Sequence, residues 1–280
     1  ERLVRVAARW GVTKLRITGG EPLVRADLPQ LIARLARVPG IVDLALSTNG
    51  MLLAEQASAL AAAGLKRVNI SLDAMNAAVF ERVSRRKGFE RVLEGIAAAA
   101  QAGFDPIKLN TVVVRGINED QIVPLARYAR EHRFHLRFIE FMPLDADRNW
   151  AKPQVLAGEQ IRAEIERALE PLYPVSGADP HQPAVDYQFL DGTTTIGFIN
   201  TVTQPFCGDC NRLRVTAEGQ LRNCLFATDE WDARRAMRAG GSDDELAELL
   251  RACVGAKRAG HGIDSHDFLR PRRAMFQIGG

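Results

Sequence analysis

Residues 13–22, TKLRITGGEP, decide the fold: a short apolar strand, TKLRIT (13–18), runs into a Gly-Gly turn, and a helical pattern follows. The same unit recurs along the first half of the chain. Further strands are predicted at VDLALST (42–48), RVNISL (67–72), IKLNTVV (107–113) and HLRFIEF (135–141), and helices near 27–38, 53–63, 75–102 (with a break near Lys87–Gly88) and 119–132. Strands that alternate with helices indicate βαβ units and a parallel sheet.

Small and polar residues stand where these strands end. The carboxyl ends of parallel strands meet at one edge, and such folds place their chemistry there. One Gly-Gly turn alone is equally well explained as a tight connection, but four polar strand ends together predict a site. These ends are Thr18-Gly19-Gly20-Glu21-Pro22, Ser47-Thr48-Asn49-Gly50, Ser71-Leu72-Asp73 and Glu140-Phe141-Met142-Pro143.

Lys108 is a candidate for this site. It shares one strand face with Asn110, whereas Ile107, Leu109 and Thr111 form the alternate face. If the apolar set packs on the helices, Lys108 points into the barrel, where a lysine needs an anionic partner. An edge strand with Lys108 in water fits the spacing equally well.

Composition sets broad limits. The chain has 280 residues, 46% of them hydrophobic, and a net charge of +3, which is too small to indicate a nucleic-acid or membrane partner. No secretory signal or membrane-spanning apolar run is present, and four cysteines do not suggest a disulfide framework, so the cytoplasm is the expected compartment. The chain opens at Glu1 inside an amphipathic pattern, and a preceding segment is expected.

The pattern changes after about residue 150. A helix near 157–169 precedes a loop-rich passage with short strands, 174–195, and a strand is predicted over 193–202. The stretch CGDCNRLRVTAEGQLRNC (207–224) then holds three cysteines. Clustered thiolates suit zinc, with Cys253 as a fourth ligand, or an iron–sulfur cluster, and spacing alone does not separate the two. Arg212 and Arg214 lie between the cysteines, two residues apart, and a strand would point both to one side.

These segments resemble a known family. The strand ends RITGGEPLVRADL, ALSTNG, VNISLDA, IKLNTVV and RFIEFMP are similar to those of radical S-adenosylmethionine (SAM) enzymes, and CGDCNRLRVT with the terminal Gly-Gly is similar to the GTP 3′,8-cyclases of molybdenum cofactor biosynthesis. The resemblance implies an α/β fold, a partial (β/α)6 TIM-type barrel over 1–150 whose first strand is absent here. It also implies a smaller C-terminal α+β region over 151–280.

The resemblance also implies the reaction. A radical derived from SAM removes the 3′ hydrogen of GTP, and the ribose carbon then attacks C8 of guanine to give (8S)-3′,8-cyclo-7,8-dihydroguanosine 5′-triphosphate. An external electron donor, a downstream cyclic pyranopterin monophosphate synthase and a homodimer are implied as partners. The family's cluster-binding C-x3-C-x2-C segment does not occur in this sequence. A chain of only these residues is therefore not expected to cleave SAM.

Family roles fall on matching residues. Gly20, Ser71 and Met142 would contact SAM, and a second [4Fe–4S] cluster would be held by Cys207, Cys210 and Cys224. Arg212, Arg214 and the tail glycines Gly279 and Gly280 would support catalysis. GTP would contact Arg16, Ser47, Lys108, Arg212, Leu213 and Arg214.

Two other functions remain open on the sequence. One is a radical SAM enzyme that modifies peptides or proteins and carries an auxiliary cluster. The other is a zinc-stabilised module that binds a nucleotide without turning it over. Metal content after reconstitution separates the zinc module from both enzymes.

Overall fold

A computed structural model describes residues 1–146, 149–177, 179, 181–263, 265–266 and 268–278. Its centre is an eight-stranded sheet in the order β1-β2-β3-β4-β5-β8-β7-β6. β1 to β5 and β8 run parallel, and β7 and β6 are antiparallel to them, so the predicted parallel sheet is confirmed. The strands are β1 (Lys14–Ile17), β2 (Asp43–Thr48), β3 (Arg67–Ser71), β4 (Ile107–Val113), β5 (His135–Glu140), β6 (Tyr173–Pro174), β7 (Val185–Gln188) and β8 (Thr195–Ile199).

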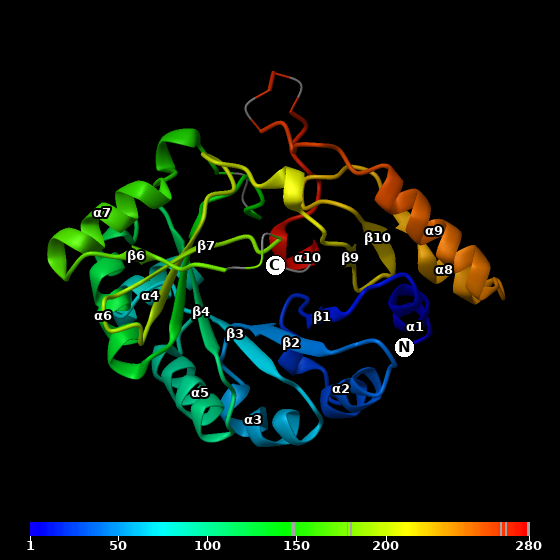
Figure 1. The fold of residues 1–280 in the computed structure, drawn as a ribbon, viewed down its shortest axis with the longest axis horizontal. Helices are drawn as coiled ribbons and strands as arrows, with labels where there is room; N and C mark the ends of the chain where they lie inside the picture. Colours follow the sequence, from blue (N-terminus) through cyan, green and yellow to red (C-terminus); the bar gives the residue numbers. More distant parts are fainter. Residues whose placement is uncertain (147–148, 178, 180, 264, 267, 279–280) are drawn as a thin grey trace.

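Helices cover the outside of the curved sheet, and the strands form an open arc inside them (Figure 1). The outer helices are α2 (Leu28–Ala36), α3 (Leu53–Ala62), α4 (Ala77–Ser84), α5 (Phe89–Gln101), α6 (Ile122–His132) and α7 (Gly158–Ala168). The predicted break between α4 and α5 is present, and Gly88 there has a φ of 116°, a conformation that favours glycine. The partial barrel that the resemblance implied is the observed architecture.

The two faces of β4 explain how the sheet separates core from site. Ile107, Leu109 and Thr111 are buried on the side that the helices cover, whereas Lys108 and Asn110 on the other side are half-buried. Burial of alternate apolar residues drives the strand against its helices. The alternative in which Lys108 points into the barrel is therefore the correct one.

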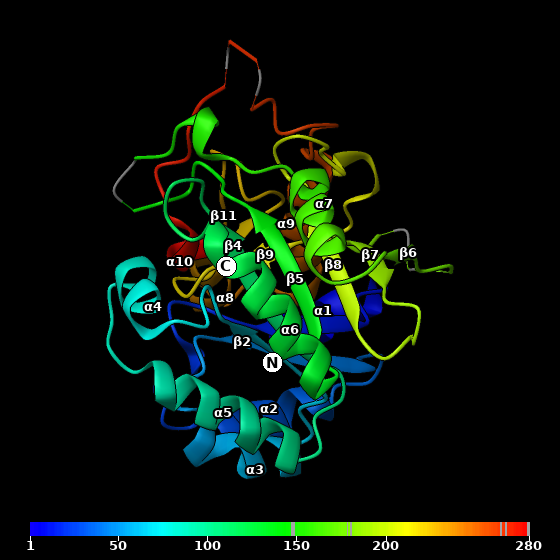
Figure 2. The ribbon, with the colours of Figure 1, turned by 90° about the vertical axis from the view of Figure 1, so that its left-hand side faces the viewer.

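The second half of the chain is not a separate layer. β8, which was predicted as a strand, pairs with β5 in parallel register, Leu136 opposite Ile196 and Phe138 opposite Phe198. Figure 2 shows these two strands side by side beneath α6 and α7. The sequence did not predict this extension of the barrel sheet, and the division at residue 150 stays a prediction.

A small sheet carries the cysteine region. It consists of β9 (Arg214–Val215), β10 (Gln220–Arg222) and β11 (Trp231–Asp232). Around it lie α8 (Ala233–Arg238) and α9 (Asp243–Gly255), and the opening helix α1 (Arg2–Arg9) packs on α9. The last helix, α10 (Met275–Ile278), lies inside the arc of strands (Figure 1). Among the described residues, no helix has the length and apolar character that crossing a membrane requires.

Candidate functional site

Polar side chains form rows across the inner face of the sheet. Residues in register on neighbouring parallel strands point to the same face, so each row gathers groups from several strands. One row runs through Ser47, Asn69, Lys108 and His135, and the next through Ser71, Asn110, Arg137, Gly197 and Asp186. Gly197 leaves room in its row, because a Cβ there would lie 2.5 Å from Asp186 Oδ1.

Three cations on this face have no hydrogen bond or ion pair within the described part of the chain: Arg16, Lys108 and Arg137. Burial, together with the charges of Arg137 and Arg67, lowers the pKa of Lys108 to about 8. Arg16 is accessible at the opening of the barrel, yet desolvation by the surrounding protein and the charges of the same two arginines lower its pKa to about 10. Desolvation is the larger cause of both shifts and repulsion among the cations adds to it, so this group of side chains favours an anion with several charges.

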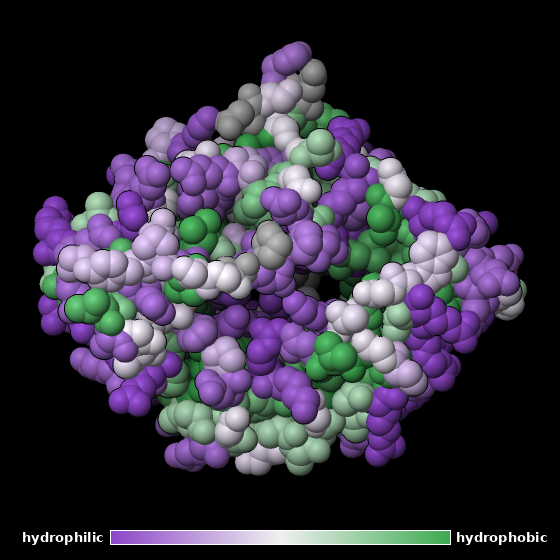
Figure 3. All heavy atoms as spheres, in the orientation of Figure 1, coloured by the Kyte–Doolittle hydropathy of each residue, from purple (hydrophilic) through white to green (hydrophobic). Residues whose placement is uncertain are grey.

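Few acids balance these cations. Asp43 is taken by Arg67, whose Nε lies 3.0 Å from Oδ1, and Asp186 acts on Arg137 by raising its pKa against the larger effect of burial. Asp186 Oδ1 itself is buried without a hydrogen bond. Figure 3 shows a hollow near the centre of this face, bordered largely by hydrophilic side chains.

Two carboxylates shape the rim of the barrel. Glu21 accepts hydrogen bonds from Thr48 Oγ1 (2.7 Å) and the Asn49 amide (2.7 Å), and so ties the turn after β1 to the turn after β2. Glu140, at the end of β5, accepts from the amides of Val202 (2.7 Å) and Thr203 (2.9 Å). These two glutamates are therefore occupied in holding loops.

The residues predicted to contact SAM lie along this rim. Gly20 has no atom within 4 Å of where a Cβ would stand, so backbone there is open to a ligand. Ser71 is exposed on the inner face beside Asn110, whose Oδ1 is buried without a hydrogen-bond partner. Met142 is half-buried against an apolar cluster of Leu144, Phe226 and Ile278. Their role toward SAM stays a prediction.

The three clustered cysteines come from two loops of the C-terminal region. Cys207 begins a short 3-10 turn, Cys207–Asp209, Cys210 directly follows this turn, and Cys224 follows β10. All three are half-buried free thiols. Burial raises the pKa of Cys207, and the charges of Cys224 and Cys210 raise it further. Thiols whose charges act on one another in this way fit a thiolate-bound centre.

No three His, Cys, Asp or Glu side chains of the described residues are grouped so that they could hold one metal ion. The thiolates of a [4Fe–4S] cluster bind separate irons instead, so the assignment of these cysteines to such a cluster stays a prediction. Cys253 is fully buried in α9 against Leu246 and Leu250, and burial raises its pKa to about 11. Cys253 is therefore a core residue of α9.

Two cations meet the sulfur of Cys210. Arg212 Nη2 lies 3.2 Å and Lys257 Nζ 3.4 Å from Sγ, and Arg212 also stacks over the ring of Phe206 at 4.9 Å. Burial tends to raise the pKa of Cys210, but the hydrogen bonds and charge of Arg212 and the charge of Lys257 outweigh it and lower the pKa to about 7. The thiolate, which is the ligating form, is favoured.

Arg214, like Arg212, is half-buried. Burial, with the charges of Arg212 and Arg16, lowers its pKa to about 10, so it belongs electrostatically to the cation group in the barrel. Leu213 between them turns the other way and packs against the apolar cluster of α1 and α9. Its predicted contact with GTP stays a prediction.

Several residues of the candidate site were not predicted from the sequence. Arg137 sits within the apolar strand HLRFIE, and only its register with Asn110 shows that it faces Lys108. Lys257 is 47 residues from Cys210, and no local pattern links them. Glu21 follows the predicted Gly-Gly turn directly, but its hydrogen bonds to Thr48 and Asn49 in the next turn depend on the fold. Gly279 and Gly280 lie outside the described residues.

Comparison with known proteins matches both halves of the chain. The Radical SAM superfamily model matches residues 1–129, and the Molybdenum Cofactor Synthesis C model matches residues 134–263. A GTP 3′,8-cyclase from Rhodopirellula baltica is 51% identical over 274 residues, 97% of this chain and 76% of that protein. One from Xanthomonas campestris pv. campestris is 46% identical over 283 residues, 100% of this chain and 83% of that protein.

A solved structure shows the same fold at low sequence identity. Streptococcus suis SuiB bound to S-adenosylmethionine has a TM-score of 0.61 and 12% identity, over 90% of this chain and 59% of SuiB. This likeness concerns the fold alone. The sequence relatives go further, because they are similar over almost the whole chain, cysteine region included. The chain belongs to the GTP 3′,8-cyclase family of radical SAM enzymes.

Proposed function

We propose that this chain binds GTP and takes part in its radical cyclisation to (8S)-3′,8-cyclo-7,8-dihydroguanosine 5′-triphosphate, the first step of molybdenum cofactor biosynthesis. The observation that carries the proposal is the group of cations without carboxylate partners, Arg16, Lys108 and Arg137, inside a barrel that also faces three thiols. A triphosphate supplies the several negative charges that such a group needs.

The cations divide the work of binding. Arg16, Lys108 and Arg137 would hold phosphate oxygens from the sheet side, with Ser47 as a hydroxyl donor in the same row as Lys108. Arg214 would approach from the small sheet, since its charge already acts on Arg16. Cations from separate elements would increase the affinity for GTP and also fix the position of its ribose. A reaction at one particular ribose carbon requires such positioning.

The thiols fit an iron–sulfur cluster. Cys207, Cys210 and Cys224 would hold it, and Arg212 and Lys257 would stabilise the thiolate of Cys210 through contacts of 3.2 and 3.4 Å. With three protein ligands, a [4Fe–4S] cluster supplies one iron open to the substrate base. Arg212 would then position GTP from beside a ligand sulfur, and Arg214 from the phosphate side.

SAM would lie at the rim, against Gly20, Ser71 and Met142, where it supplies the hydrogen-abstracting radical. The two-cluster arrangement of the family needs a C-x3-C-x2-C segment, whereas the cysteines of this sequence are Cys207, Cys210, Cys224 and Cys253 only. We therefore assign to these residues the substrate side of the reaction. What they do is bind, orient and keep water from GTP.

Other parts of the proposal rest on the family resemblance alone. They are an external electron donor, delivery of product to a cyclic pyranopterin monophosphate synthase, a homodimer and a cytoplasmic location. The division of the chain into 1–150 and 151–280 belongs with them. The tail glycines Gly279 and Gly280 would complete the active site.

Anaerobic reconstitution with iron and sulfide tests the assignment of the cysteines. We expect about four irons and no zinc per chain, an amount that Cys224→Ala lowers sharply. Cys253→Ala is the matched control, because Cys253 is a buried thiol outside the site and its loss should leave the iron content unchanged. One zinc per chain would instead identify the zinc-stabilised module.

Titration with GTP tests the substrate. The Arg137→Met variant should bind GTP about 10- to 100-fold more weakly, because a charge-assisted hydrogen bond contributes about 1.5–3 kcal/mol. Arg91→Met is the control, since Arg91 pairs with Glu55 on the outside of the barrel. Equal affinities of Arg137→Met and the unaltered chain would contradict the site.

A further inference from the structure

The segment before α10 holds two arginines that reach in opposite directions. Arg270 donates from Nε to the Pro143 carbonyl (3.0 Å) and pairs with Asp145, both in the loop after β5. Arg273 pairs with Glu230, in the loop between β10 and β11. The tail is thereby fastened to the barrel on one side and to the cysteine-bearing sheet on the other.

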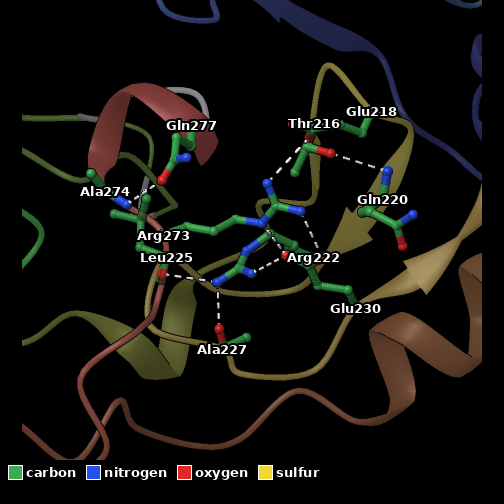
Figure 4. Close-up of polar contacts among 10 residues, drawn as sticks. All are labelled: Thr216, Glu218, Gln220, Arg222, Leu225, Ala227, Glu230, Arg273, Ala274 and Gln277. Carbon is green, nitrogen blue, oxygen red and sulfur yellow. Dashed lines mark hydrogen bonds and ion pairs between the residues drawn. The ribbon is translucent and has the colours of Figure 1, made fainter. Parts of the chain in front are cut away.

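Glu230 is the centre of the second attachment (Figure 4). Its two carboxylate oxygens accept from Arg273, Oε1 from Nε at 2.6 Å and Oε2 from Nη2 at 3.0 Å, and Oε1 also pairs with Arg222 Nη1. Bidentate arginine–carboxylate pairs fix orientation as well as distance. The side chains of Arg273 and Glu230 are only 24% and 22% exposed, so water screens this pair less than a surface one.

Arg222 links this carboxylate to the cysteine site. Its side chain is 3% exposed, it lies two residues before Cys224, and it stands opposite Arg214 in the register of β10 and β9. Its Nη2 donates to the Ala227 carbonyl and, at 3.4 Å, to the Leu225 carbonyl, so it also holds the loop after Cys224. Glu230 therefore joins the tail to the strand and loop that position a ligand and a substrate arginine.

The tail in turn contacts the site. The Met275 amide donates to the Leu144 carbonyl (2.9 Å), and Ile278 is fully buried against Leu144 and Phe226. The Ile278 carbonyl accepts from Arg214 Nη1 at 3.5 Å. This backbone acceptor helps to hold the guanidinium of Arg214 as long as α10 stays docked.

We propose that Arg273 and Glu230 are positioning residues: their ion pair docks α10, and the docked α10 orients Arg214 toward the substrate. Neither residue touches the substrate itself. The effect on GTP rests on the proposed function, but the docking of the tail does not. Glu218, 3.3 Å from Arg273 Nη1 and 51% exposed, adds a weaker third contact.

The variant Arg273→Met removes the tail's side of the pair and leaves Glu230 with Arg222, so the cysteine-bearing sheet keeps its buried ion pair. We expect carboxypeptidase to remove the C-terminal residues about tenfold faster, because cleavage follows the population of the open state. GTP affinity should fall about three- to tenfold. Iron content after reconstitution should not change.

Arg91→Met is again the matched control, an arginine–glutamate pair outside the barrel whose loss should alter neither tail release nor GTP affinity. Arg273→Lys should be intermediate in both, because an ammonium keeps the charge but cannot make the bidentate contact. This milder variant decides the question if Arg273→Met does not fold.

Tail release and GTP affinity equal to those of the unaltered chain, in both Arg273 variants, would overturn the inference. Faster tail release with unchanged GTP affinity would overturn the link to Arg214 and leave only the docking. If the unaltered chain does not bind GTP at all, the proposed function fails, whereas tail release still tests the ion pair on its own.

Discussion

The scarcity of acidic partners in the barrel changes the pKa of single cationic residues. Lys108 has an ordinary side chain in an unusual place: burial and the charges of Arg137 and Arg67 lower its pKa to about 8, and only Asp186 acts in the other direction. Part of the population is therefore neutral at mildly alkaline pH. A bound triphosphate would favour the charged form and restore it.

This pKa makes GTP affinity depend on pH. As pH rises from 7 to 9, Lys108 in the free site loses its proton and the affinity should fall several-fold, since binding must then also take up a proton. Lys108→Arg should remove most of this dependence, because arginine stays charged in that range. Calorimetric titration with GTP at both pH values measures the difference. An equally steep fall in Lys108→Arg would contradict the assignment.

Asp73, after β3, shows the opposite shift. Burial raises its pKa to about 6, against the effect of a hydrogen bond from the Val112 amide (2.8 Å). The folded chain therefore binds a proton that the unfolded chain has lost between about pH 4 and 6, and stability from this group falls as pH rises through that window. Above about pH 6 the buried, charged carboxylate destabilises the folded chain.

Asp73→Asn removes this charge and keeps an acceptor for the Val112 amide. The free energy of unfolding should rise by about 2 kcal/mol at pH 7.5, and the gain should nearly vanish at about pH 3, where the carboxyl is largely protonated in both states. Urea unfolding at the two pH values gives the comparison. A variant less stable than the unaltered chain at pH 7.5 would show that the carboxylate has a partner in solution.

How far the sequence predicted the site also follows from single residues. Lys108 could be found because alternation within one strand separates it from Ile107 and Leu109. Arg137 could not, because its inward direction depends on its register with Asn110, a contact between strands that local pattern does not encode. The same holds for Lys257, which reaches Cys210 from the end of another helix.

At the scale of elements, α5 lies unusually close to the turn before α3. A Cβ on Gly95, in the middle of α5, would stand 2.4 Å from the Gly50 carbonyl oxygen and 3.2 Å from Leu53 Cβ. Glycine in a helix interior usually costs stability relative to alanine. Here it permits the close packing of two helices on the sheet.

Gly95→Ala should therefore destabilise the fold, by about 1–3 kcal/mol, although alanine is the better helix former. Gly255→Ala is the matched control: Gly255 ends α9, and nothing lies within 4 Å of its added Cβ. That change should be neutral or slightly stabilising. Urea midpoints compare the two variants, and a stabilised Gly95→Ala would mean that α5 can move away from Gly50 without loss.

The strands and helices of the first half were predicted within one to two residues at most ends, because alternation and helical periodicity are local signals. The place of β8 was not. Its apolar residues predicted a strand but not which strand it pairs with. The need for glycine at position 197 comes from the close approach of Asp186 and Arg137, and the local sequence around Gly197 does not show this approach. The sequence therefore predicted the strands and helices themselves, but not which distant strands pair with one another.

At the scale of the whole molecule, distant segments complete one another. α1 at the start of the chain buries Val6 and Ala7 in the same cluster as Leu246 and Leu250 of α9, and Arg2 Nε pairs with Asp243 Oδ1 at 2.8 Å. The amphipathic pattern of α1 showed that it packs, but not that its partner lies near the other end. The barrel and the cysteine region therefore share this apolar cluster.

The pairing of β5 with β8 makes a strong prediction about where the chain can be cut. A fragment of residues 1–150 would expose the backbone of β5 from Leu136 to Ile139 and the ring of Phe138, which stacks on Phe198 at 6.1 Å between centroids. An open apolar strand edge of this kind promotes association rather than folding. A fragment of residues 1–204 keeps α7 and the strands β6 to β8.

We expect the 1–204 fragment to unfold cooperatively in urea and the 1–150 fragment to show no cooperative transition, or to aggregate. The opening helix α1 lacks α9 in both fragments, so its loss cancels in the comparison and the difference reports on β8 and its neighbours. Circular dichroism and light scattering on the two fragments give the answer. If residues 1–150 unfold at the same midpoint as residues 1–204, the barrel ends at β5, and the boundary predicted from the sequence at residue 150 is the physical one.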